Sequence, residues 1–189
     1  MIPELGLFAL VVALFIASAL ATLPIIGAAR SNLAWMQLAR PAALAQFVFV
    51  LLAFGCLMAS FVNNDFSVVN VATNSNSQLP LPYRMAASWG SHEGSMLLWV
   101  LMLSGWTCAV SLLSRSLPLA MVARVLGVMG FISVGFLLFI LLTSNPFDRL
   151  LPPAMDGRDL NPLLQDPGMV IHPPMLYMGY VGFAVAFAF

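Results

Sequence analysis

Two histidines are the residues of this chain best suited to ligand chemistry, and His172 has the more unusual setting. It lies within residues 161–180, which read NPLLQDPGMVIHPPMLYMGY. Turn-forming residues precede it, and two prolines and an apolar run follow it. A residue before proline is disfavoured in the helical conformation, so we expect His172 to be extended, just outside a helix with Pro174 in its first turn. Such a backbone would hold an imidazole in place for haem iron, zinc or copper.

The surroundings of His172 limit which metal group it can bind. No second histidine or cysteine follows at ligand spacing, so this loop cannot complete a site for a small metal ion. Haem differs, because the porphyrin supplies four donors and one protein residue can supply a single axial position. The alternative is a structural histidine at the membrane interface, and the chemistry of a lone histidine favours that alternative.

The second histidine, His92, begins an aromatic segment, residues 89–106, which reads WGSHEGSMLLWVLMLSGW. A spacing of three to four predicts that one helix face carries His92, Met96, Trp99, Leu103 and Trp106. This face would suit a flat hydrophobic ligand, with an imidazole at its outer end. Ordinary helix packing, with Trp89 and His92 at the membrane interface, explains the same pattern. The pattern alone favours this explanation over a ligand surface.

The elements that position these residues are predicted to be membrane helices. Hydrophobic residues make up 61% of the 189 residues and charged residues only 7%, so lipid must be the solvent of this chain. The net charge is zero without a basic run, which argues against nucleic acid as a partner. The prediction is an all-α, polytopic membrane protein with one helical domain over residues 1–189 and five spans, at about 5–29, 41–62, 94–114, 125–143 and 173–189.

The distribution of arginine predicts the topology. Each short connection between spans carries two arginines and no acid, whereas the long connections 63–93 and 144–172 carry all the internal acidic residues. The positive-inside rule therefore places the N-terminus and both long connections outside. The last apolar run is short for a span and has no polar flank, so we expect the N-terminal part of a longer protein or one piece of a split one.

Other features indicate packing more than chemistry. Cys56 and Cys108 are expected at depths that differ by roughly 12 Å, too far for a disulfide, so both are interpreted as small buried residues. Gly127, Gly130 and Gly135 suggest close helix contacts. Residues 67–83 are compatible either with a short strand pair or with a segment along the membrane surface.

Two segments resemble the CcmF family, the membrane haem lyases of cytochrome c maturation, and relatives that serve nitrite reductase. These segments read LPLPYRMAASWGSHEGSMLLW and NPLLQDPGMVIHPPMLYMGYVGF. The resemblance covers essentially all of this chain but only the first part of the family's length. It implies that His172 is one of two external histidines that hold haem at the outer face. The other external histidine, a tryptophan-rich segment and two membrane histidines for a structural haem b would lie downstream.

The resemblance also implies a reaction, in which the two haem vinyl groups add to the thiols of a CxxCH segment in an apocytochrome. No catalytic residue is expected here: His172 would be a positioning ligand, and His92 and Trp89 would be weaker contacts with haem. The implied partners are a periplasmic haem chaperone, apocytochrome-binding subunits, apocytochrome c and lipid, in the bacterial inner membrane. The alternative is a cofactor-free transporter or structural subunit, but no span interior carries the charge that ion-coupled transport favours.

Overall fold

The computed structural model describes residues 1–189 and contains five helices long and apolar enough to cross a membrane. They are α1 (Ile2–Ala29), α3 (Ala39–Val62), α6 (His92–Leu113), α7 (Leu119–Thr143) and α8 (Pro167–Ala188). This confirms the predicted all-α membrane fold with five spans. Apart from α8, the helix whose start differs most from the prediction is α7. It begins six residues before the predicted Val125, because the preceding connection ends at Pro118 and not at Arg124.

Shorter helices occupy the connections. They are α2 (Leu33–Gln37), α4 (Val69–Asn74), α5 (Leu81–Ala87) and the 3-10 helix η1 (Pro162–Gln165). No strand pair forms within residues 67–83; the only β-type contact is one antiparallel bridge between Val68 and Arg149. This bridge joins the two long connections to each other at one end of the bundle.

The core forms where α1 lies between α3 and α7. Small residues let these helices approach closely, and Ala9, Ala13, Ala17 and Ala21 of α1 are almost completely buried. A Cβ at Gly130 would come within 2.8 Å of the Ala21 backbone nitrogen, and one at Gly127 would collide with Ile25. The predicted close contacts at Gly127 and Gly130 are therefore confirmed. The prediction for Gly135 is wrong, because no atom lies within 4 Å of a Cβ built there.

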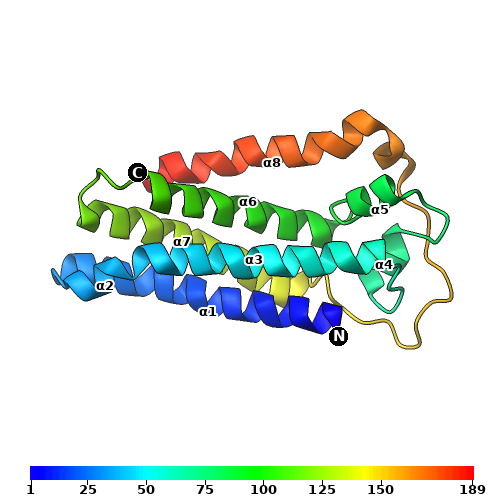
Figure 1. Ribbon diagram of the computed structural model, residues 1–189, viewed down its shortest axis with the longest axis horizontal. Coiled ribbons are helices and arrows are strands. Elements are labelled where there is room, and N and C mark those ends of the chain that lie inside the picture. Colours follow the sequence, from blue (N-terminus) through cyan, green and yellow to red (C-terminus); the bar gives the residue numbers. More distant parts are fainter.

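The two ends of the bundle differ (Figure 1). The N-terminus, α4, α5 and the α7–α8 connection gather at one end, which we call the long-loop end, and the short connections lie at the other. Arg149 joins three parts of the long-loop end, since its guanidinium pairs with Glu4 at 2.5 Å, with Asp65 at 3.5 Å and with the Ser67 hydroxyl. The predicted grouping of the N-terminus with both long connections is thus present in the fold.

Helix α8 begins earlier than predicted, and the expectation that His172 is extended outside the helix is wrong. Asp166 caps the helix by accepting the backbone N–H of Gly168 at 2.8 Å and of Met169 at 3.3 Å, and Pro167 occupies the first turn. This cap starts the helix ahead of His172, which therefore lies in its second turn, and the helix continues through Pro173 and Pro174. The local preference of a residue before proline is overridden by a strong start signal upstream.

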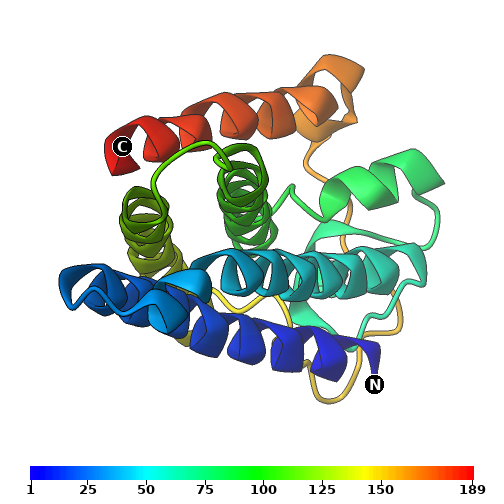
Figure 2. The same ribbon diagram turned by 60° about the vertical axis from the view of Figure 1, so that its left-hand side comes forward.

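Helix α8 lies on the outside of the bundle, across α6 and α7 (Figure 2). Val181 is its only buried residue, and most of its large apolar side chains are exposed. The helix that carries His172 is thus the least covered of the five spans.

Candidate functional site

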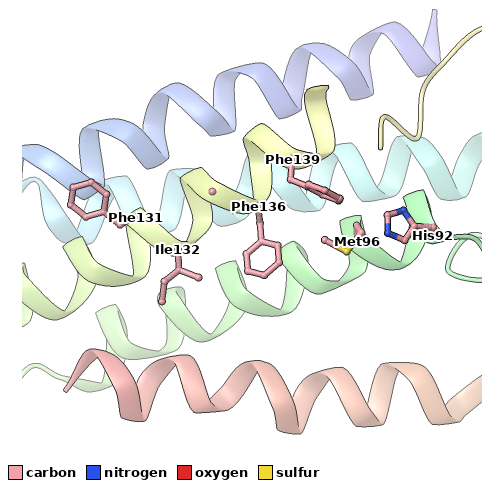
Figure 3. Close-up of a pocket in the computed structure, with 7 residues that line it drawn as sticks. His92, Met96, Phe131, Ile132, Phe136 and Phe139 are labelled. Atoms are coloured by element: carbon pink, nitrogen blue, oxygen red, sulfur yellow. The ribbon is translucent and has the colours of Figure 1, made fainter. Parts of the chain in front are cut away.

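A groove of about 410 Å³ runs between α6 and α7, with His92 among its lining residues (Figure 3). Helix α6 contributes His92 and Met96, and α7 contributes Phe131, Ile132, Gly135, Phe136 and Phe139. The groove falls within the usual volume of small-molecule sites, and apart from His92 its lining residues are apolar or glycine. It offers an apolar aromatic surface with one imidazole.

The imidazole of His92 is held from two directions. Its Nδ1 lies 2.8 Å from the hydroxyl oxygen of Ser144, the residue that directly follows α7. Its ring meets the ring of Phe139 edge-on, with centroids 6.0 Å apart. Nε2 is the ring nitrogen that remains free for a ligand.

The predicted face of α6 divides between the two interpretations. Met96 joins His92 in the open groove, as expected for a ligand surface. Trp99 instead packs against Phe136 and Tyr177, and Trp106 donates from Nε1 to the carbonyl of Met178 at 3.1 Å. The part of the face near the long-loop end is therefore open, whereas Trp99 and Trp106 pack against α7 and α8.

Trp89 lies beside the turn of α8 that precedes His172. Pro174 has no N–H, so the carbonyl of Val170, four residues before it, loses its intrahelical donor. The indole N–H of Trp89 donates to this carbonyl at 3.1 Å. Trp89 therefore supplies the hydrogen bond that the proline removes, and it links the start of α6 to the turn before His172.

His172 itself is exposed, and its side chain forms no hydrogen bond or ion pair within the chain. It does not line the groove of His92. The structure thus brings Trp89 to the helix of His172 but does not join the two histidines in one pocket. Both belong to the same end of the bundle.

Glycines explain how the two motifs pack together. A Cβ at Gly90 would lie 2.9 Å from Leu164 and 3.3 Å from Leu160, which belong to the segment leading into α8. A Cβ at Gly94 would collide with the carbonyl oxygen of Ser88. Gly94 therefore leaves no room for a side chain in the WGSHEGS turn, whereas a side chain at Gly90 would only have to displace the ends of two leucine side chains.

The structure contains no group of three or more histidine, cysteine or acidic side chains that could hold a metal ion. Cys56 and Cys108 form no disulfide, and Cys56 is buried as predicted, but the predicted burial of Cys108 is wrong because this residue is only partly covered. An exposed imidazole can still supply one axial bond to a haem iron. Sequence reasoning missed Ser144, because a serine at the end of an apolar run gives no signal of the histidine that it contacts.

Comparisons with known proteins agree with this architecture. A model of the family described as "Cytochrome C assembly protein" matches residues 89–189. The cytochrome c-type biogenesis proteins CcmF of Pseudomonas aeruginosa and of Escherichia coli are 64% and 59% identical over 190 aligned positions, and NrfE of Haemophilus influenzae is 46% identical over 188. Each alignment covers 100% of this chain but only 29% or 30% of the relative, so the chain spans less than a third of their length.

A solved structure gives the same result. The protein described as "Cytochrome c Heme Lyase CcmF" matches 100% of this chain and 29% of its own chain, with a TM-score of 0.86 and 26% sequence identity. The family model, the relatives and the fold agree with one another. The chain therefore belongs to the cytochrome c assembly protein family, and it corresponds to the N-terminal portion of the CcmF proteins.

Proposed function

We propose that this chain forms part of a cytochrome c haem lyase, in which His172 is an axial ligand that holds haem at the outer face of the membrane. The observation that carries the proposal is the hydrogen bond from Trp89 to Val170. It stabilises a helix turn weakened by two prolines, two residues before an exposed imidazole without a partner. The helix turn thus holds the imidazole of His172 in place, while no other residue of this chain bonds to the imidazole.

The surface around His172 suits a flat apolar group. Ile171, Met175 and Leu176 are exposed on the same part of α8, and burying apolar surface of this kind stabilises a bound macrocycle. His172 would supply one axial bond, and the opposite ligand would come from residues outside this chain. The groove of His92 and the indole of Trp89 would provide weaker contacts nearby.

In the proposed reaction haem is the substrate, and its vinyl groups accept the two thiols of a CxxCH segment. Each thiol sulfur bonds to a vinyl carbon while the thiol proton is transferred to the other carbon, so no electrons are gained or lost overall. The residues of this chain would act by orientation, which makes attack on a held substrate effectively intramolecular. None of them is proposed as an acid or base.

The partners and the second haem are also proposals. A haem chaperone and apocytochrome-binding subunits would meet the long-loop end, where the proposed haem ligand lies. His92 begins α6 and His172 lies in the second turn of α8, both at that end, so a structural haem b inside the bundle would take its ligands from the part of the relatives that this chain does not match.

The location follows from the charge pattern. The two short connections, α1–α3 and α6–α7, lie at the end of the bundle opposite the long loops (Figure 1). By the helix bounds, these connections and the helix turns next to them carry Arg30, Arg40, Arg115 and Arg124, so the positive-inside rule assigns this end to the cytoplasm. We therefore propose a bacterial inner membrane protein whose long-loop end faces the periplasm. Labelling of Ser77→Cys in intact cells with a membrane-impermeant thiol reagent tests this orientation, and absence of labelling would contradict it.

The decisive experiment compares the full-length protein with His172→Ala. Haem per polypeptide and oxidised and reduced absorption spectra are measured, together with cytochrome c formation in cells. We expect the variant to lose the exposed haem and to form cytochrome c at least about tenfold less, since metal-ligand contacts commonly carry effects of this size. Phe187→Ala, which removes an exposed side chain of α8 about four turns away from His172, is the matched control. Equal haem content and equal maturation in His172→Ala would overturn the proposal.

A further inference from the structure

Two grooves adjoin each other along α6. One, of about 380 Å³, lies between α3, α6 and α8, and its lining residues are apolar apart from Gly105. The other, of about 400 Å³, lies between α6, the α6–α7 connection and the end of α8. Trp106 and Ala109 line both, so we describe the two together as the α6 groove.

The polarity of the α6 groove changes along its length. The part beside α3 has no polar lining side chain, whereas the part beside the α6–α7 connection has two, Ser114 and Ser116. From Leu101 to Leu113 the groove follows α6 for about 18 Å at helical rise, a little more than half of a hydrocarbon core of about 30 Å. The groove therefore has the length of one lipid leaflet, and its polar end lies where the helices end.

Two arginines belong to the polar end of the groove. Arg40, in the first turn of α3, donates from Nη2 to the carbonyl oxygen of Ser114 at 3.1 Å, which places its guanidinium beside a lining residue. Arg115 is exposed and lies in the chain between the two lining serines. Neither arginine forms an ion pair. By the helix bounds, this end of the bundle also carries Arg30 and Arg124, whereas all seven acidic residues belong to the long-loop end.

We propose that the α6 groove binds an anionic phospholipid, with an acyl chain along α6 and the phosphate at Arg40 and Arg115. Guanidinium groups bind phosphate oxygens through paired N–H donors, and basic pockets between membrane helices bind anionic lipid headgroups. Because this end carries four arginines and no acid, it favours a lipid of net negative charge over a zwitterionic one. The site lies at the end of the bundle opposite His172, so the inference goes beyond the proposed function and does not rest on it.

Native mass spectrometry of the full-length protein in detergent measures lipid binding. Phosphatidylglycerol is the anionic probe, and phosphatidylethanolamine with the same acyl chains is the zwitterionic one. We expect phosphatidylglycerol to bind more tightly. Arg115→Gln should lower its affinity about fivefold, the contribution of one basic residue near an anionic membrane surface, and should leave phosphatidylethanolamine unchanged. Arg40→Gln should have the same effect, and Arg40→Lys should restore part of the affinity. Arg30→Gln removes the same charge from α1, which lines neither part of the groove, and is the matched control.

A second variant tests the apolar part of the groove. Ala109 lines both parts, so Ala109→Phe should fill the place where they adjoin and weaken the binding of both lipids. Unchanged phosphatidylglycerol affinity in this variant would show that the lipid does not lie in the groove, and would overturn the inference. Equal affinity of the parent protein for the two lipids, or equal losses in Arg30→Gln and Arg115→Gln, would also overturn it. Arg115 is exposed and unpaired, so its variant provides the test even if Ala109→Phe fails to fold. Haem content is not a readout here, so the result for His172→Ala judges the proposed function separately.

Discussion

Helices α1 and α8 are both apolar enough to cross a membrane, but the protein uses them in opposite ways. Ten residues of α1 are buried, against one of α8. In their most apolar windows the buried shares are 39% and 6%. The alanines of α1 allow backbones to approach, whereas α8 carries large side chains that face outward. Apolar composition therefore predicts a span, and the sizes of the side chains decide how closely it packs.

The few contacts that hold α8 are aromatic and polar. The indoles of Trp89 and Trp106 each donate to a carbonyl of α8 at 3.1 Å, and the rings of Trp99 and Tyr177 lie 5.2 Å apart. These contacts fix the position of the helix while most of its surface stays uncovered. A surface that binds a large ligand or another segment needs to be both fixed in position and uncovered. The interior around α1 does not need an uncovered surface.

The largest effect is expected where α1 packs most closely. Gly130→Leu would place a side chain against the Ala21 backbone and destabilise the fold by about 1–3 kcal/mol. Gly135→Leu, on the same helix but facing open space, is the control and should change stability little. Thermal unfolding of the purified protein measures both. Equal melting temperatures for the two variants would show that α1 does not depend on small residues.

A smaller and more local effect is expected in α8. Trp89→Phe removes the donor to the Val170 carbonyl, at a cost of about 1 kcal/mol, which corresponds to roughly fivefold faster amide exchange in the following turns. Trp106→Phe should produce the same change near Met178 instead. Hydrogen–deuterium exchange locates the effect. Faster exchange across α1 in either variant would contradict the view that the two helices are held independently.

The smallest effect concerns the connection that leads into α8. The hydroxyl and backbone N–H of Ser77, followed by the N–H of Gly157, hold the pKa of the Asp156 carboxyl below its usual range. Because the pKa is lowered in the folded state, this contact stabilises the connection above about pH 4 and is lost as the pH falls through the folded pKa. Ser77→Ala should raise the pKa measured by carboxyl ¹³C NMR, and Ser77→Thr should restore it. An unchanged pKa in Ser77→Ala would show that the contact does not form in solution.

The sequence alone was sufficient for the fold class and for the number of spans, because apolar runs of about 20 residues have few alternatives in lipid. It also predicted that Met96 shares the face of His92, and that Gly127 and Gly130 meet a neighbouring helix. These predictions depend on the helical repeat and on side-chain size, which can be read locally. The roles of His172, His92 and Trp89 as haem contacts stay predictions.

Tertiary structure decided the features that depend on residues distant in the chain. The helical conformation of His172 starts from the local Asp166 cap, but the turn before it is also held by Trp89, which lies 81 positions from the carbonyl that it binds. The pairing of His92 with Ser144 spans 52 positions, and Gly135 meets no neighbour although its sequence setting resembles that of Gly130. No local pattern shows which side chain replaces the hydrogen-bond donor that a proline lacks, because that side chain reaches the free carbonyl only when the helices pack.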